Sequence, residues 1–301
     1  MEKAIVTGGA GFIGSHLADN LIKEGLDVHI IDDLSSGKVK HLPASASFHQ
    51  LDIRSQEARE LITSIKPDVI YHLAAQADVN RSLNDPHMDM LVNVGGTINI
   101  LEACRNLSLK KFVFSSTSAV YGNSSESVLT EDVSASPLSF YGLSKLAAER
   151  YITLYHDLFS IPYTILRYGN VYGPRQTAKG EGGVIAVFTD KLSKGESLKV
   201  NGDGLQTRDY VYVQDIVSAN IAAGKAPDVG TFVVGTGIPT SLLDVIKILE
   251  TTTGKSISYI HGQDRPGDIK HSCLDPALIS RVLGWTPRFN MDMGISETVC
   301  R

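Results

Sequence analysis

The sharpest chemical signal in the sequence is a tyrosine and a lysine four residues apart, Tyr141 and Lys145. At the start of a helix this spacing places the phenol and the ammonium on one face. A tyrosine with the ordinary pKa of about 10 is a poor base at neutral pH, but a neighbouring ammonium favours its phenolate. Such a pair can take a proton from a carbinol while the carbon is oxidised. An exposed helix pair without chemistry is the alternative interpretation of this spacing alone.

A hydroxyl-rich strand end lies upstream of that pair, in Phe-Val-Phe-Ser-Ser-Thr at residues 112–117. Thr117 could hydrogen-bond the oxygen that loses its proton. We therefore predict Tyr141, Lys145 and Thr117 as the catalytic residues.

Three glycines near the N-terminus, Gly8, Gly11 and Gly14, follow a predicted strand and open a predicted helix. In this setting they allow a tight turn, close approach of a pyrophosphate to the backbone, and close packing of helix on sheet. The helix N-terminus also offers free N–H groups to the anion. Asp32 ends the second strand about 20 residues downstream, where a carboxylate accepts from a ribose 2′-OH. Three glycines alone would suit an ordinary turn, but with Asp32 they predict a dinucleotide site.

Asp32 also favours NAD over NADP, because its charge would repel a 2′-phosphate. Residues 34–37 hold no arginine that could attract that phosphate, although Lys38 is close. Asp52 and Ile53 would suit the adenine edge, and residues 73–75 would leave a floor of small side chains, although ordinary strand-end packing would explain both equally well. The predicted NAD contacts are Gly8, Gly11, Phe12, Ile13, Gly14, Asp32, Leu34, Ser35, Gly37, Asp52, Ile53, Leu73, Ala74, Ala75, Ser115, Tyr141 and Lys145.

The elements that must position these residues alternate between short β-branched runs and amphipathic stretches. This alternation predicts an α/β fold of the Rossmann type, a doubly wound parallel sheet whose ligands bind beyond the carboxyl ends of the strands. The predicted strands are residues 4–7, 28–31, 69–72, 111–115 and 163–167, with a third strand before Asp52. The predicted helices between them are residues 12–23, 55–65, 88–105 and 141–159.

After Asn170 the alternation becomes irregular. A glycine-rich loop at 180–183 precedes a predicted helix at 184–192, and short strands are predicted at 198–200, 211–213 and 231–234, with helices at 216–223, 244–251 and 276–283. We expect residues 1–168 to form the NAD-binding domain, completed by part of 209–240. Residues 169–301 would form most of a smaller, discontinuous C-terminal α/β lobe that binds the substrate.

Composition narrows the class of protein. The 301 residues are 43% hydrophobic and 20% charged, with a net charge of -5, which fits a globular chain without a nucleic-acid footprint. No leader or membrane-spanning run is visible, so we expect a cytoplasmic protein that binds neither nucleic acid nor membrane. Cys104, Cys273 and Cys300 lack the spacing of a disulfide framework or a zinc site, and no metal is predicted.

The motifs together resemble the NAD-dependent epimerase/dehydratase family of extended short-chain dehydrogenases, most of all its UDP-glucose 4-epimerases. The resemblance rests on Thr-Gly-Gly-Ala-Gly-Phe-Ile-Gly at 7–14, Phe-Ser-Ser-Thr-Ser-Ala-Val-Tyr-Gly at 114–122, the Tyr141 and Lys145 motif, Arg-Tyr-Gly-Asn-Val-Tyr-Gly-Pro-Arg-Gln at 167–176, and Arg-Asp-Tyr-Val-Tyr-Val at 208–213. It covers essentially the whole chain. It is more specific for the family than for one reaction.

The resemblance implies further site residues. Thr117 takes the Ser/Thr position of the catalytic triad, Tyr168 packs near the nicotinamide, and arginine forks would hold the substrate diphosphate. A surface salt bridge is the alternative for each arginine alone. The implied substrate contacts are Ser116, Thr117, Tyr141, Asn170, Val184, Val200, Arg208, Arg265, Asp268 and Ser272.

One position favours epimerisation among the reactions of this family. The similar dehydratases and decarboxylases carry an acidic residue before Val-Tyr-Gly, where this chain has Ala119. An alanine methyl moves no proton at C5 or C6. The expected function is therefore a 4-epimerase that interconverts UDP-glucose and UDP-galactose through a 4-keto sugar with tightly bound NAD.

Other substrates and activities stay open at this stage. Ser272 would leave room for N-acetylated sugars, and Arg81 and Arg175 could approach the carboxylate of UDP-glucuronate. A dehydratase, decarboxylase or reductase of the same family is the alternative reaction, and an NAD-sensing protein without catalysis is the alternative class.

We also expect a homodimer. The apolar faces of the predicted helices 88–105 and 141–159 exceed what one sheet face needs, and the resemblance implies that they pair as a four-helix interface.

Overall fold

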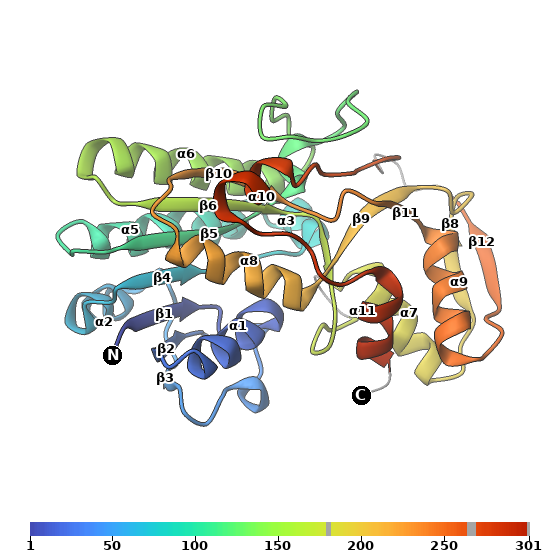
Figure 1. The fold of residues 1–301 in the computed structure, drawn as a ribbon, viewed down its shortest axis with the longest axis horizontal. Helices are drawn as coiled ribbons and strands as arrows, with labels where there is room; N and C mark the ends of the chain where they lie inside the picture. The colour runs from blue at the N-terminus through green and yellow to red at the C-terminus, as the bar shows by residue number, and fades with distance from the viewer. Residues whose placement is uncertain (179–181, 264–268, 300–301) are drawn as a thin grey trace.

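A computed structural model describes residues 1–178, 182–263 and 269–299 (Figure 1). Its centre is a seven-stranded parallel sheet in the order β10-β6-β5-β4-β1-β2-β3. Hydrophobic runs form these strands, and the central β4 and β6 are buried along their whole length, as expected when helices cover both faces. The strands are β1 Lys3–Thr7, β2 Asp27–Ile31, β3 Ser47–His49, β4 Val69–His72, β5 Lys111–Thr117, β6 Tyr163–Tyr168 and β10 Gly230–Val234.

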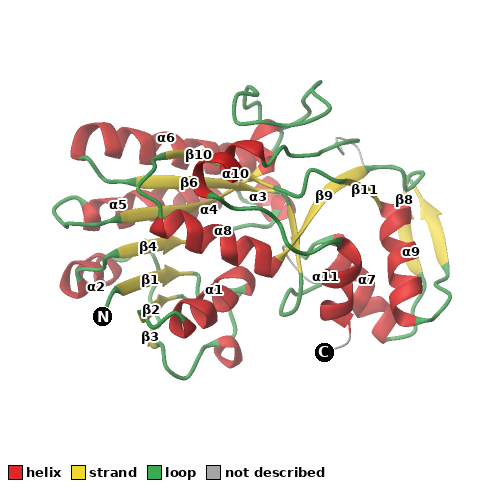
Figure 2. Cartoon of the chain, viewed as in Figure 1, coloured by secondary structure: helices red, strands yellow, loops and turns green. Residues whose placement is uncertain are grey.

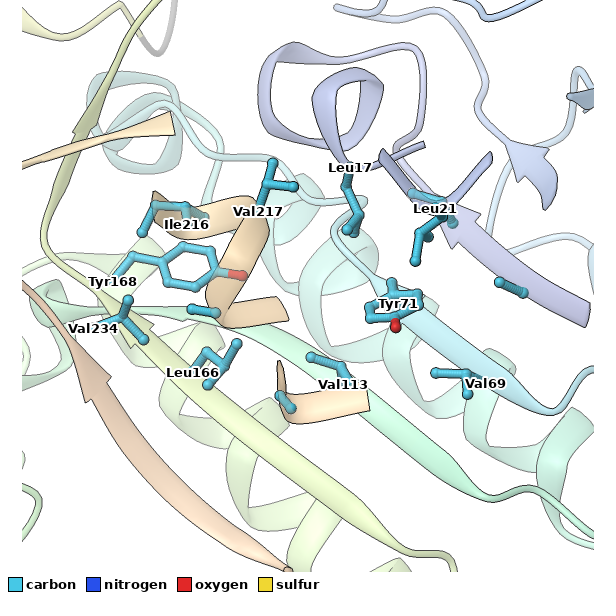
Figure 3. Close-up of a cluster of buried hydrophobic side chains, with 14 of the residues drawn as sticks. Leu17, Leu21, Val69, Tyr71, Val113, Leu166, Tyr168, Ile216, Val217 and Val234 are labelled. Atoms are coloured by element: carbon cyan, nitrogen blue, oxygen red, sulfur yellow. The ribbon is translucent and has the colours of Figure 1, made fainter. Parts of the chain in front are cut away.

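Helices cover both faces of this sheet (Figure 2). On one face α1 (Phe12–Lys23) lies beside α8 (Val213–Lys225), and Leu17 and Val217 pack with Tyr71 of β4 in the core that Figure 3 shows. On the other face α2 (Gln56–Ile65), α5 (Thr97–Cys104) and α6 (Phe140–Phe159) enclose a second core. The doubly wound Rossmann architecture predicted from the sequence is confirmed.

A smaller lobe lies beyond the carboxyl ends of the large sheet (Figure 1). It holds a three-stranded sheet in the order β11-β9-β7 and a parallel pair of β12 with β8. Its own core includes Ile185, Val200, Tyr212 and Leu249. The elements are β7 Asn170–Tyr172, α7 Val184–Ser193, β8 Leu198–Asn201, β9 Thr207–Tyr212, β11 Pro239–Ser241, α9 Leu242–Thr253, β12 Tyr259–Gly262 and α11 Met291–Val299.

The chain crosses between the two parts more than once. After β9 in the small lobe, α8 and β10 return to the large sheet, and α10 (Ala277–Leu283) packs against β10 near the end of the chain. The Trp285 indole donates to Ser218 of α8 at 2.8 Å, which fixes this last return. Substrate and cofactor residues from distant segments can therefore meet at one edge of the sheet.

Some predicted elements need correction. The single helix predicted for 88–105 is α4 (Pro86–Met90), a π-helical turn at Leu91–Gly96, and then α5. The two adjacent glycines at 95 and 96 weaken a regular helix there. Asp52 lies three residues beyond β3 rather than at its end. The short helix α3 (Val79–Asn84), capped by Asp78, and the three-residue strands β7 and β11 were not predicted.

No helix in the described ranges is long and apolar enough to cross a membrane.

Candidate functional site

A cavity of about 320 Å³ opens at the carboxyl ends of the parallel strands. This volume suits a small-molecule ligand, and the edge is where doubly wound sheets bind them. The structure brings most predicted cofactor contacts to its wall. These are Gly8, Gly11, Phe12, Ile13, Gly14, Asp32, Ser35, Asp52, Ile53, Leu73, Ala74, Ala75, Ser115, Tyr141, Lys145 and Tyr168.

The turn from β1 into α1 leaves no space for side chains at two of its glycines. Gly8 has a φ of +71°, and a Cβ there would lie 2.7 Å from the Ala74 nitrogen. A Cβ on Gly14 would lie 2.2 Å from the Gly8 carbonyl oxygen. The absence of these atoms lets the backbone and the first N–H groups of α1 face the cavity directly. The turn therefore fits the pyrophosphate of a dinucleotide.

Asp32 lies at the end of β2 with 7% of its surface exposed. Its carboxylate accepts from the Ala10 N–H at 3.0 Å and from the Leu34 N–H at 2.8 Å. Burial raises the pKa of Asp32, while these two backbone hydrogen bonds oppose the shift. A Cβ on Gly37 would lie 2.8 Å from Asp32 Oδ1, so Gly37 leaves that oxygen room. Leu34, at a φ of +62°, and Gly37 shape this loop but do not line the cavity.

Asp52 carries its own counter-charge at the cavity wall. Arg54 donates to it from Nε at 3.0 Å and from Nη2 at 2.5 Å. The side-chain hydrogen bond from Arg54 holds the pKa of Asp52 below its usual value. The carboxylate is therefore charged and already partly satisfied where the adenine was predicted to lie.

The floor at residues 73–75 is tied to the sheet by a buried chain of hydrogen bonds. The Ala74 N–H donates to Thr7 Oγ1 at 3.2 Å, and Thr7 Oγ1 lies 2.7 Å from His72 Nδ1. The other ring nitrogen of His72 contacts Thr97 Oγ1 at 3.0 Å. Complete burial lowers the pKa of His72 to about 3, so the ring is neutral at ordinary pH.

The three predicted catalytic residues all line the same cavity. Tyr141 and Lys145 lie in the first turns of α6, which the Ser139 side chain caps by accepting from the Gly142 N–H at 3.1 Å. Thr117 ends β5, and its Oγ1 accepts from the Ala119 N–H at 3.1 Å. The end of a strand and the start of a helix therefore present a hydroxyl, a phenol and an amine to one space.

Lys145 is almost fully buried, with its Nζ 4.1 Å from the centre of the Phe114 ring. Burial lowers the pKa of Lys145 to about 7, while the carboxylates of Glu149 and Asp89 act in the opposite direction. A lysine in this environment changes its charge near neutral pH. It is suited to a site in which a proton moves.

A buried ion pair that the sequence did not indicate lies next to the predicted catalytic residues. Glu149 of α6 accepts from Arg167 of β6 at 2.7 Å and 3.0 Å, and the same arginine donates to the Tyr121 hydroxyl at 2.9 Å. Ser116 donates to Glu149 at 2.5 Å. Side chains alternate along a strand, so Ser115 and Thr117 face one way and the Ser116 hydroxyl faces the other. Ser116, predicted to contact substrate, lines the cavity, although its hydroxyl donates to Glu149.

The remaining predicted residues divide into two groups. Asn170 lines the cavity, and Tyr168 lines it while its hydroxyl contacts Asn220 of α8 at 3.0 Å. Val184, Val200, Arg208 and Ser272 do not line it, and Val200 is buried in the core of the small lobe. Arg265 and Asp268 lie outside the described residues, as does Cys300.

Several lining residues were not predicted. The most informative is Gln176, which ends the motif at 167–176 and donates from Nε2 to the Val171 carbonyl at 3.1 Å. The other unpredicted lining residues are Asp33, Ser36, Leu51, Ala77, Val92, Gly169, Val171 and Gly183. Most of them follow strand ends in sequence, and that position was the available signal.

Across the residues that the structure describes, no three His, Cys, Asp or Glu side chains gather as a metal-binding group. Cys104 and Cys273 are buried free thiols.

Comparison with known proteins covers nearly the whole chain. Residues 4–235 match the profile of the NAD dependent epimerase/dehydratase family. A UDP-glucose 4-epimerase of Mycolicibacterium smegmatis is 39% identical over 304 residues, which cover 99% of this chain and 97% of that protein. The crystal structure of a UDP-glucose 4-epimerase with UDP-glucose from Thermotoga maritima has a TM-score of 0.95 at 41% identity, covering 99% of this chain and 97% of the other. A UDP-glucuronic acid 4-epimerase from Bacillus cereus, in complex with UDP-glucuronic acid and NAD, has a TM-score of 0.91 at 33% identity, covering 99% and 98%.

Proposed function

Because the chain belongs to the NAD dependent epimerase/dehydratase family, we propose that it is a UDP-sugar 4-epimerase that interconverts UDP-glucose and UDP-galactose. The observation that carries the proposal is the convergence of Tyr141, Lys145 and Thr117 on the cavity that the glycine turn also lines. Ala119 supports the choice of reaction, because its methyl group offers no proton for elimination across C5 and C6.

The proposed chemistry is a reversible oxidation at C4 of the sugar. Bound NAD supplies the oxidation and the later re-reduction of that carbon. Tyr141 takes the proton of the C4 hydroxyl and returns it to the C4 oxygen after the 4-keto sugar has turned over. Lys145 stabilises the phenolate through its positive charge, and Thr117 orients the C4 oxygen by a hydrogen bond.

Two parts of the chain would divide the binding. Residues 1–168, with part of 209–240, hold the dinucleotide, and residues 169–301 hold most of the nucleotide sugar. Asn170 lines the cavity, and Arg208, half-buried on β9, is the described arginine that we assign to the diphosphate. A diphosphate anchored in this way leaves the hexose free to present either face to the cofactor.

UDP-glucuronate is the second candidate, because the Bacillus cereus neighbour binds it. In this chain the two arginines considered for its carboxylate do not line the cavity: Arg175 is paired with Asp19 at 2.7 Å, and Arg81 is exposed on α3. UDP-N-acetylglucosamine is a further candidate, since the small side chain of Ser272 would leave room for an N-acetyl group. Ser272, however, does not line the cavity either. A neutral hexose therefore remains our first choice.

The test is to incubate purified protein separately with UDP-glucose, UDP-N-acetylglucosamine and UDP-glucuronate and to separate the product sugars. We expect UDP-galactose from UDP-glucose, without consumption of added NADH. A 4-keto-6-deoxy product would instead indicate a dehydratase, and stoichiometric use of NADH would indicate a reductase. Either of these results would overturn the proposal.

A further inference from the structure

The charge of Lys145 depends on a small number of groups, because its side chain is almost out of contact with water. Glu149 follows on the same helix, Asp89 comes from α4, and His72 comes from β4. His72 is neutral at ordinary pH, since burial lowers its pKa to about 3. The two carboxylates are therefore the buried negative charges that favour the ammonium form of Lys145.

These two carboxylates are not equivalent. Glu149, which favours the ammonium form of Lys145 more strongly than Asp89 does, also forms an ion pair with Arg167 at 2.7 Å. Asp89 is 1% exposed, and in the described parts of the chain it forms no ion pair. A buried carboxylate without a close cation is expensive unless its charge serves another group. Lys145 is the cation on which Asp89 acts.

Hydrogen bonds hold Asp89 against the first turns of α6. Its Oδ1 accepts from Gln76 Nε2 at 2.8 Å and from Asn93 Nδ2 at 3.3 Å, and its Oδ2 accepts from Ser144 Oγ at 2.5 Å. Ser144 precedes Lys145 in sequence, and its hydroxyl also lies 3.0 Å from the Tyr141 carbonyl oxygen. Asn93 belongs to the π-helical turn, an irregularity often found at functional sites.

We propose that Asp89 is a positioning residue for the proton transfer: its buried carboxylate favours the charged form of Lys145, and its hydrogen bond from Ser144 holds the Tyr141 turn of α6 against α4. It acts through Lys145 and Ser144 and lies outside the cavity lining. The expected effect of Asp89 on the reaction rate rests on the proposed function. The charge relation between Asp89 and Lys145 is a property of the protein without substrate.

Asp89→Asn tests the charge without changing the shape. The remaining carbonyl oxygen can still accept from Gln76 and Asn93, and the new amide can donate to Ser144 Oγ. Without the negative charge, Lys145 should lose its proton at lower pH by roughly one unit. The alkaline limb of the pH–rate profile should move in the same direction. Activity above that limb should fall about tenfold, with little change at the acid end.

The titration of Lys145 is read directly by NMR on substrate-free protein isotopically labelled at the lysine ε carbon, with Lys145→Met to assign the resonance. Glu102→Gln is the matched control, because it also replaces a carboxylate by an amide. Glu102 lies on α5, accepts from the Tyr155 hydroxyl of α6 at 2.6 Å and does not line the cavity. It should move neither readout. Ser144→Ala keeps the charge of Asp89 but removes the hydrogen bond that joins it to α6. This variant should lower kcat without shifting the titration of Lys145.

An unmoved Lys145 titration in Asp89→Asn would overturn the inference, and so would an equal loss of activity at every pH. Asp89→Ala provides a second neutral variant if the first does not fold. If wild type shows no epimerase activity while the titration still moves, the proposed function fails and the charge relation stands.

Discussion

At the scale of single residues, burial of charge determines what each group in the site can do. Asp32 accepts hydrogen bonds from two backbone N–H groups. The burial of Lys145 disfavours its charge, and two carboxylates favour it. His72 is neutral and contacts two threonines. Asp32, Tyr141 and Lys145 could be proposed as site residues from the sequence, because their types and spacing suit the chemistry. Asp89 and Glu149 could not, because their contacts join elements far apart in sequence.

His72 predicts an acid-dependent loss of stability. Its pKa falls from 6.5 to about 3 on folding, so between these values the unfolded chain binds a proton that the folded chain does not. The free energy of unfolding should therefore decrease as pH falls through this range, by about 1.4 kcal/mol per pH unit from this residue. His72→Phe should remove that part of the slope in urea denaturation. His261→Phe, at an exposed histidine, should leave the slope unchanged, and an equal slope in wild type and His72→Phe would contradict the assignment.

Asp32 predicts the choice of cofactor. Asp32→Ala removes the acceptor for the ribose hydroxyl, so NAD should bind more weakly. It also removes the charge that repels a 2′-phosphate, so the preference for NAD over NADP should become smaller. It also leaves the Ala10 and Leu34 N–H groups without their acceptor, which should cost about 1–3 kcal/mol of stability. Calorimetric titration and urea denaturation measure the two effects. A wild-type preference for NADP would refute this interpretation.

At the scale of elements, short fully buried strands and amphipathic helices were the predictable part. The predicted bounds of β4 and α1 agree with the structure, because an apolar run or an amphipathic repeat defines each. The π-helical turn within 88–105 was missed, since its residues continue an apolar pattern that a regular helix would share. The three-residue strands β7 and β11 were missed, because so few side chains do not form a clear alternation.

The prediction of a homodimer concerns the outer face of α6. Leu143, Leu154 and Leu158 are at least half exposed on this helix, which is a large apolar surface for one helix face. Leu154→Lys should place a charge in the expected four-helix interface and shift the protein toward monomer in sedimentation experiments. Leu205→Lys, at a similarly exposed leucine in a loop, should not. Wild type that sediments only as monomer at micromolar concentration would count against the dimer.

At the scale of the whole molecule, the two lobes meet where the parallel strands end, and the cavity draws its wall from both. Gly8, Asp32 and Lys145 come from the large sheet and its helices, whereas Asn170 and Val171 come from β7 of the small lobe. The change of pattern after Asn170 was the basis for predicting a separate substrate-binding lobe from the sequence.

The most direct test of the account is the rate at which Tyr141→Phe interconverts UDP-glucose and UDP-galactose, measured beside wild type at equal bound NAD. The substitution removes the proton carrier and preserves the ring, so turnover should fall by roughly 10²–10⁴-fold while UDP binding survives. Thr117→Val should cost less, because it removes only an orienting hydrogen bond. A Tyr141→Phe protein that epimerised UDP-sugars at nearly the wild-type rate would contradict the central claim.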